Sequence, residues 1–112
     1  MAIEKRKHAR INSLNLSYIC LDENNKIVKQ GMGRTLNVSE SGILLETNFP
    51  VDTRHKVKLT IGLEEDIIEL QGCPVHSKKN DKNLFEVGIE FQESDESTKK
   101  ILKKFIRAFN AK

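Results

Sequence analysis

The sequence is poor in the residues that most directly fix a structure or a chemistry. It contains only two cysteines, Cys20 and Cys73, which lie far apart in the chain and form neither a disulfide framework nor a CxxC pair for zinc or redox chemistry. We expect both thiols to be reduced and buried. Tryptophan is absent, and the aromatic residues are one Tyr and five Phe. A folded core must therefore be mainly aliphatic.

Long apolar runs and catalytic signatures are also missing. No apolar stretch approaches the roughly 20 residues of a membrane span, and no signal-peptide pattern follows the basic start. We therefore expect a cytoplasmic protein without membrane insertion. His8, His55 and His76 lack metal-ligand spacing, and no GxSxG, HExxH, P-loop or complete GxGxxG motif occurs. These absences argue against an enzyme and predict no catalytic residue, no metal site and no cofactor.

Positive charge is concentrated at the start of the chain. Residues 1–12 hold four basic side chains and one acidic side chain, a balance of +3 that equals the net charge of all 112 residues. Residues 13–112 hold 15 basic and 15 acidic side chains. This division predicts a flexible basic arm on a neutral body, and a small anionic partner rather than long nucleic acid or a membrane surface. A solvated terminus without a function is the alternative.

Alternation of apolar and polar residues predicts six short strands in one domain that spans residues 13–112. They cover residues 14–20, 27–39, 43–47, 56–61, 67–76 and 84–91. Polar turns join them, as in an antiparallel barrel or sandwich. Pro74 predicts an edge or a bulge in the fifth strand, and the glycines at 31 and 33 suggest a bulge in the second. Phe85 and Phe91 are expected to face inward.

The hydrophobic period becomes helical near the end of the chain. Five apolar residues recur at helical spacing, and they are Ile101, Leu102, Phe105, Ala108 and Phe109. Ser94 or Asp95 can cap the start of a helix over about 94–110, and the basic residues that follow suit its dipole. We expect this helix to pack its apolar stripe on the barrel. A membrane-lying or partner-binding helix is the alternative.

Two short motifs could bind a ligand. RKHAR places Arg6 and Arg10 four residues apart on the basic arm. NVSESG, at residues 37–42, places Asn37 and Ser39 on one face of a strand end, with Gly42 where the hairpin returns. An amide, a hydroxyl and a residue without a side chain would then line one spot. An ordinary polar turn that closes a hairpin is the alternative.

In this order and spacing, the two motifs resemble those of the PilZ domain family. RKHAR matches RxxxR and NVSESG matches (D/N)xSxxG, and the strand pattern, the GIEF at residues 88–91 and the final helix also resemble the family over residues 4–109. The resemblance implies a mainly β fold, a six-stranded antiparallel β-barrel of Greek-key or split type with a C-terminal helix. It also implies a bacterial, non-enzymatic receptor for cyclic di-GMP that signals to a downstream protein partner.

The resemblance further implies which residues bind the dinucleotide. The matching positions are Arg6, Arg10, Asn37, Ser39 and Gly42, and this chain has Asn37 where many members have Asp. A planar, forked guanidinium can pair bidentately with phosphate or with guanine, and it can stack on a purine.

Three further residues are secondary candidates for ligand binding. Lys5 and Lys7 would add charge beside the motif arginines. His76 falls at the end of the fifth strand, where members often carry Arg or Trp beside the ligand.

Two other functions stay open on the sequence. One is a PilZ-like protein-interaction module with weak or no nucleotide binding. The other is a small barrel that binds single-stranded nucleic acid, although such grooves need several exposed aromatic residues along a basic strip.

Overall fold

The computed structural model describes residues 15–63 and 66–111, and it contains six strands and one helix. The elements are β1 (Asn15–Leu21), β2 (Ile27–Val38), β3 (Gly42–Thr47), β4 (Lys56–Leu63), β5 (Asp66–Lys79), β6 (Phe85–Phe91) and α1 (Glu96–Asn110). The predicted basic arm and its boundary near residue 12 lie outside the described residues.

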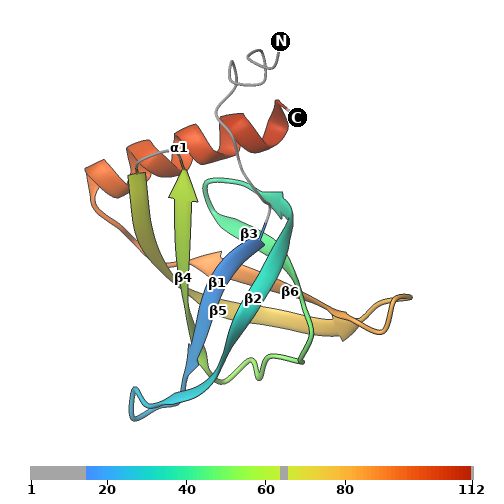
Figure 1. The fold of residues 1–112 in the computed structure, drawn as a ribbon. Helices are drawn as coiled ribbons and strands as arrows, with labels where there is room; N and C mark the ends of the chain where they lie inside the picture. The colour runs from blue at the N-terminus through green and yellow to red at the C-terminus, as the bar shows by residue number, and fades with distance from the viewer. Residues whose placement is uncertain (1–14, 64–65, 112) are drawn as a thin grey trace.

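The strands form a closed antiparallel barrel in the order β1-β2-β3-β6-β5-β4, with β4 paired back to β1 (Figure 1). This confirms the predicted fold class. Every consecutive pair of strands lies side by side except β3 and β4, whose connection passes along one end of the barrel. The turn after β1 contains Asn25 in the left-handed conformation, with φ of 62°. The Asn-Asn pair therefore closes the β1–β2 hairpin as the sequence indicated.

The barrel interior is filled by alternate residues of the strands. Tyr18, Leu59 and Ile61 are almost completely buried, and so are Leu70 and Val87. Phe85 and Phe91 are only half-buried and pack against this core from its edge, so the expectation that they face inward is confirmed in part. The core is mainly aliphatic, as the composition predicted, and its fully buried aromatic residues are Tyr18 and Phe105.

Helix α1 lies across one end of the barrel (Figure 1) and buries Leu102, Phe105 and Ala108 in the same core. Its N-cap is Asp95, whose Oδ1 accepts a hydrogen bond of 2.8 Å from the backbone N–H of Thr98. The predicted core packing of the helix is therefore confirmed. Within the described residues, no helix is long and apolar enough to cross a membrane.

Two local predictions need correction and one is confirmed. The register of β2 shifts at position 28 against β1 and at position 36 against β3, whereas Gly31 and Gly33, where a bulge was expected, pair in regular register with β1. The predicted irregularity near Pro74 is confirmed, since the β5–β6 register shifts between residues 74 and 76. Cys73 is exposed rather than buried, because its neighbours at 72 and 74 take the inward positions.

Candidate functional site

The polar spot predicted at residues 37–42 is formed by the β2–β3 hairpin. The backbone N–H of Ser39 donates to the carbonyl of Gly42 over 2.8 Å, which closes the turn. The Ser39 hydroxyl accepts a hydrogen bond of 3.2 Å from the backbone N–H of Ser41 and lies 3.1 Å from the Ser41 hydroxyl. Both serines are exposed. The hydroxyls thus stabilise the turn and still face solvent, where a ligand could exchange hydrogen bonds with them.

Asn37 is exposed on the same hairpin, and the buried Val38 separates it from Ser39. The side-chain oxygen of Asn37 accepts a hydrogen bond of 3.0 Å from the backbone N–H of Val38. Within the described residues, the Asn37 NH₂ group makes no hydrogen bond. It is therefore available as a donor beside the two serine hydroxyls.

These residues line a cavity of about 290 Å³ that lies over β2, β3, β5 and β6. Asn37, Ser39 and Gly42 border it from the hairpin, and His76 and the half-exposed Val75 border it from β5. The structure therefore brings four of the predicted site residues to one place. The other four, which are Lys5, Lys7, Arg6 and Arg10, lie outside the described residues.

His76 is positioned by a glycine on the neighbouring strand. His76 pairs with Gly88 of β6, and a methyl group at Gly88 would lie 2.5 Å from the imidazole Nε2. The absence of a side chain at Gly88 therefore lets the imidazole lie over β6 at the edge of the cavity. Sequence reasoning missed this role of Gly88, although a glycine inside an apolar strand is a known signal of close approach.

Gly42 has a structural role of its own. A methyl group at Gly42 would overlap the backbone carbonyl oxygen of Ile89, because β3 and β6 approach closely where they start to pair. A glycine is thus required here by the barrel itself. Its presence in the motif does not depend on a ligand.

The cavity has little positive charge of its own. None of the twelve described residues that line it is Lys or Arg, and Glu90 is its only acidic residue. Its walls offer hydrogen-bonding groups, the His76 imidazole and apolar surface from Val75 and Leu44. An anionic ligand at this place would need cations from outside the cavity walls.

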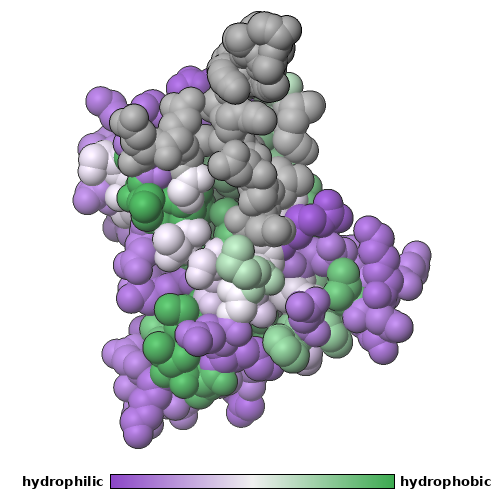
Figure 2. Space-filling view, in the orientation of Figure 1, coloured by the Kyte–Doolittle hydropathy of each residue, from purple (hydrophilic) through white to green (hydrophobic). Residues whose placement is uncertain are grey.

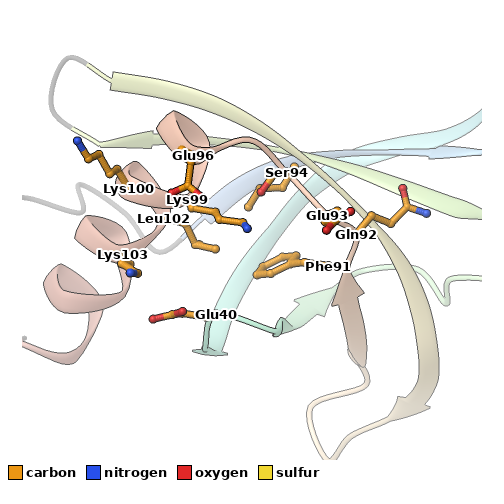
Figure 3. Close-up of a pocket in the computed structure, with 11 residues that line it drawn as sticks. Glu40, Phe91, Gln92, Glu93, Ser94, Glu96, Lys99, Lys100, Leu102 and Lys103 are labelled. Atoms are coloured by element: carbon orange, nitrogen blue, oxygen red, sulfur yellow. The ribbon is translucent and has the colours of Figure 1, made fainter.

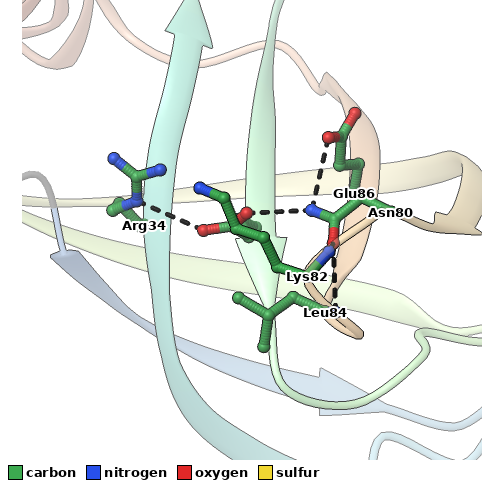
Figure 4. Close-up of polar contacts among 6 residues, drawn as sticks. Arg34, Asn80, Lys82, Leu84 and Glu86 are labelled. Carbon is green, nitrogen blue, oxygen red and sulfur yellow. Dashed lines mark hydrogen bonds and ion pairs between the residues drawn. The ribbon is translucent and has the colours of Figure 1, made fainter.

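A second polar cluster lies near the other end of β3 (Figure 4). Glu46 is buried, with 7% of its surface exposed. Its carboxylate accepts hydrogen bonds from Arg34 Nε at 3.2 Å and from Asn80 Nδ2 at 2.9 Å. Burial acts to raise the pKa of the Glu46 carboxyl, but the bonds from Asn80 and Arg34 outweigh it and hold that pKa below its ordinary value.

This cluster stabilises the β5–β6 hairpin rather than forming a reactive site. The Asn80 side-chain oxygen accepts hydrogen bonds from the backbone N–H groups of Lys82 and Leu84, so one side chain links the turn to Glu46. Within the described parts of the chain, no group of three or more His, Cys, Asp or Glu side chains could hold a metal ion.

The chain is thus a small closed β-barrel that one helix caps, with a polar cavity beside a serine-containing hairpin. The family comparison makes this specific, because the PilZ domain model matches residues 4–108. The chain therefore belongs to the PilZ domain family. The match includes the RKHAR segment, the hairpin motif and most of α1.

Two solved structures share the fold. One is the PilZ domain of CeSA from a cellulose-synthesizing bacterium, with a TM-score of 0.63 and 8% identity over 93% of this chain and 99% of that one. The other is MrkH from K. pneumonia in its apo state, with a TM-score of 0.54 and 13% identity. That match covers 88% of this chain and 50% of MrkH, so this chain spans about half the length of MrkH. No curated protein matches the sequence.

Proposed function

We propose that this protein is a non-enzymatic receptor for cyclic di-GMP, which binds at the cavity between the β2–β3 hairpin and His76. The observation that carries the proposal is the convergence of Asn37, Ser39, Gly42 and His76 on one cavity of a PilZ domain. These residues come from two segments that are distant in sequence. Their meeting supports a common ligand better than either motif does alone.

The charge of the cavity supports a role for the basic arm in binding. Cyclic di-GMP carries two phosphates, and the described walls of the cavity supply no Lys or Arg. The arm has four basic residues, including Arg6 and Arg10. We propose that these two arginines complete the site by bidentate contacts to phosphate or guanine, and that Lys5 and Lys7 add only charge.

The remaining groups have distinct roles in this proposal. The Asn37 NH₂ group and the Ser39 hydroxyl hydrogen-bond to polar edges of the ligand, while the His76 imidazole and Val75 give one guanine a partly apolar surface. Binding orders the arm, and the new surface alters contact with a downstream protein partner of unknown identity. The protein is proposed to act in the bacterial cytoplasm.

Isothermal titration with cyclic di-GMP tests the proposal. Arg6→Ala and Arg10→Ala should each abolish measurable binding, since a good bidentate contact is worth about 1–3 kcal/mol and the described lining of the cavity offers no replacement cation. Lys5→Ala and Lys7→Ala are matched controls on the same arm and should weaken binding less than about tenfold. Wild-type affinity in the Arg6→Ala/Arg10→Ala double variant would refute the proposed site.

One observation favours a second candidate, a PilZ-like interaction module without nucleotide binding. Ser39 and Gly42 are both explained by the turn and by the close approach of β3 to β6, so a motif of this form can be retained for folding alone. A flat titration of the folded wild-type protein, together with capture of a protein partner, would favour this candidate.

A further inference from the structure

The neutral body of the chain is electrostatically divided. Residues 13–95 contain nine basic and 14 acidic side chains, whereas α1 contains five basic side chains and one acidic side chain, Glu96. The barrel strands and loops therefore carry a net charge of −5, and the helix carries +4. A sum over the whole body hides this separation.

The helical period places all five cations on one face. Lys99, Lys100, Lys103, Lys104 and Arg107 are exposed. At 100° per residue they fall within an arc of about 140°, opposite the buried face that packs on the barrel. This exposed set is called here the basic face of α1. It carries no large exposed apolar side chain.

Three acidic residues, Glu40, Glu93 and Glu96, line the same cavity as Lys99, Lys100 and Lys103, but among the described residues only one cation of the basic face forms an ion pair. Lys104 Nζ lies 3.5 Å from the Asp66 carboxylate, and both side chains are partly exposed. Within the described residues, Lys99, Lys100, Lys103 and Arg107 make no ion pair. Lys99, Lys100 and Lys103 line a cavity of about 570 Å³, and Glu40 borders the same cavity from the β2–β3 hairpin (Figure 3).

An exposed apolar residue lies at the start of β5, the strand that contacts α1. Ile67 directly follows Asp66, the partner of Lys104, and 72% of its surface is exposed, the largest fraction among the exposed large apolar residues of the described chain. The start of β5 meets α1 at the capped end of the barrel (Figure 1). A cationic helix face and an exposed isoleucine on the strand that contacts this helix are the two kinds of feature by which peripheral proteins bind an anionic bilayer surface.

We propose that the basic face of α1 is a peripheral docking surface for anionic lipid headgroups. The helix is about 22 Å long, so it can lie flat on a bilayer while the acidic barrel points away from it. Its apolar side stays in the protein core, so α1 rests on the headgroups and does not insert. Nucleic acid would match the cations equally well but would gain nothing from Ile67. This inference goes beyond ligand binding and does not depend on it.

Vesicle co-sedimentation of the full chain tests the inference. The protein should bind vesicles that contain about one-third phosphatidylglycerol and not vesicles of phosphatidylcholine alone, and high salt should release it. Each surface cation strengthens such binding roughly fivefold, so Lys99→Gln/Lys100→Gln/Lys103→Gln should weaken it about 100-fold. Ile67→Ser should weaken it several-fold, and this loss should persist as salt is varied.

The β5–β6 hairpin offers a control of equal charge. Lys78→Gln/Lys79→Gln/Lys82→Gln removes three exposed lysines from the hydrophilic hairpin that projects from the barrel (Figure 2), and it should change vesicle binding by less than about threefold. Circular dichroism should give the same fold for both triple variants.

Three results would overturn the inference. They are no binding to anionic vesicles, equal losses in the helix and hairpin variants, and tighter binding to a duplex oligonucleotide than to vesicles at equal phosphate concentration.

Glu64 and Glu65 precede Asp66 in the sequence. Their neutralisation in Glu64→Gln/Glu65→Gln should strengthen vesicle binding, and unchanged or weaker binding would also count against the inference.

Discussion

Replacing Gly42 by alanine tests whether the hairpin glycine is required by the barrel. The new methyl group would overlap the Ile89 carbonyl oxygen, which belongs to the backbone and cannot rotate away. The two strands would have to separate locally by on the order of 1 Å to restore ordinary contact. Next to this point, the N–H of Phe91 donates to the Ser41 carbonyl over 2.9 Å.

The magnitude of the effect follows from these contacts. Weakening one or two backbone hydrogen bonds costs about 0.5–1.5 kcal/mol each, and overpacking a close contact costs about 1–3 kcal/mol. We therefore expect Gly42→Ala to lower the free energy of unfolding by about 1.5–6 kcal/mol. That is a large part of the 5–15 kcal/mol that is typical of a small domain.

Gly62 of β4 provides the matched control. Nothing lies within 4 Å of a methyl group at that position, and no described glycine has a positive φ. Gly62→Ala should leave stability unchanged or raise it by about 0.4–1 kcal/mol, because alanine restricts the unfolded chain. Urea unfolding followed by circular dichroism measures both variants. If Gly42→Ala unfolds at the wild-type midpoint with an unchanged slope, the β3–β6 packing argument is wrong.

Three further predictions concern the helix cap, the buried carboxylate and the cavity. Asp95→Ala should lower the unfolding free energy by about 1 kcal/mol in thermal melts, while Ser97→Ala, which leaves the bond to Thr98 intact, should change it little. The pKa of Glu46 is lowered on folding, so its contribution is present above the ordinary value of 4.5 and is lost as pH falls through the folded value. Urea titrations should therefore show a smaller loss of stability between about pH 5 and pH 3 for Glu46→Gln than for the wild type. Gly88→Ala should displace the imidazole of His76 and weaken cyclic di-GMP binding in calorimetry at nearly unchanged stability.

The strands and the helix could be predicted from the sequence because their side chains obey simple periods. Leu16 and Tyr18 alternate with polar residues, and the α1 stripe recurs every three or four residues, so both patterns indicate which face is buried. The exposure of Cys73 follows the alternation of β5, in which Leu70 is buried and Gln71 is exposed, and the wrong expectation came from the usual burial of cysteine. The bulge at position 36 did not follow from a period, because it depends on the pairing of β2 with β3, which only the barrel register determines.

The candidate site was predictable to a similar degree. The motif residues were proposed from their spacing and His76 from the resemblance to PilZ domains, which expected it at the end of the fifth strand, whereas β5 continues to Lys79. The contact of His76 with Gly88 needs the β5–β6 register after the bulge, and the overlap at Gly42 needs the closure of β3 on β6. These contacts are made between segments that are distant in the sequence, so no local sequence pattern predicts them. The structural roles of both glycines are therefore visible only in the folded barrel.

The β2–β3 hairpin separates the two proposed binding surfaces, so their functions can be tested independently. Ser39 and Ser41 line the cavity that contains His76, whereas Glu40 lines the other cavity, beside α1. A Ser39→Ala variant should therefore weaken cyclic di-GMP binding and leave vesicle binding intact. The Lys99→Gln/Lys100→Gln/Lys103→Gln variant should do the reverse, because none of its lysines lines the His76 cavity. If both variants lost both activities together, the two surfaces would be one site, and the division of charge between barrel and helix would need another explanation.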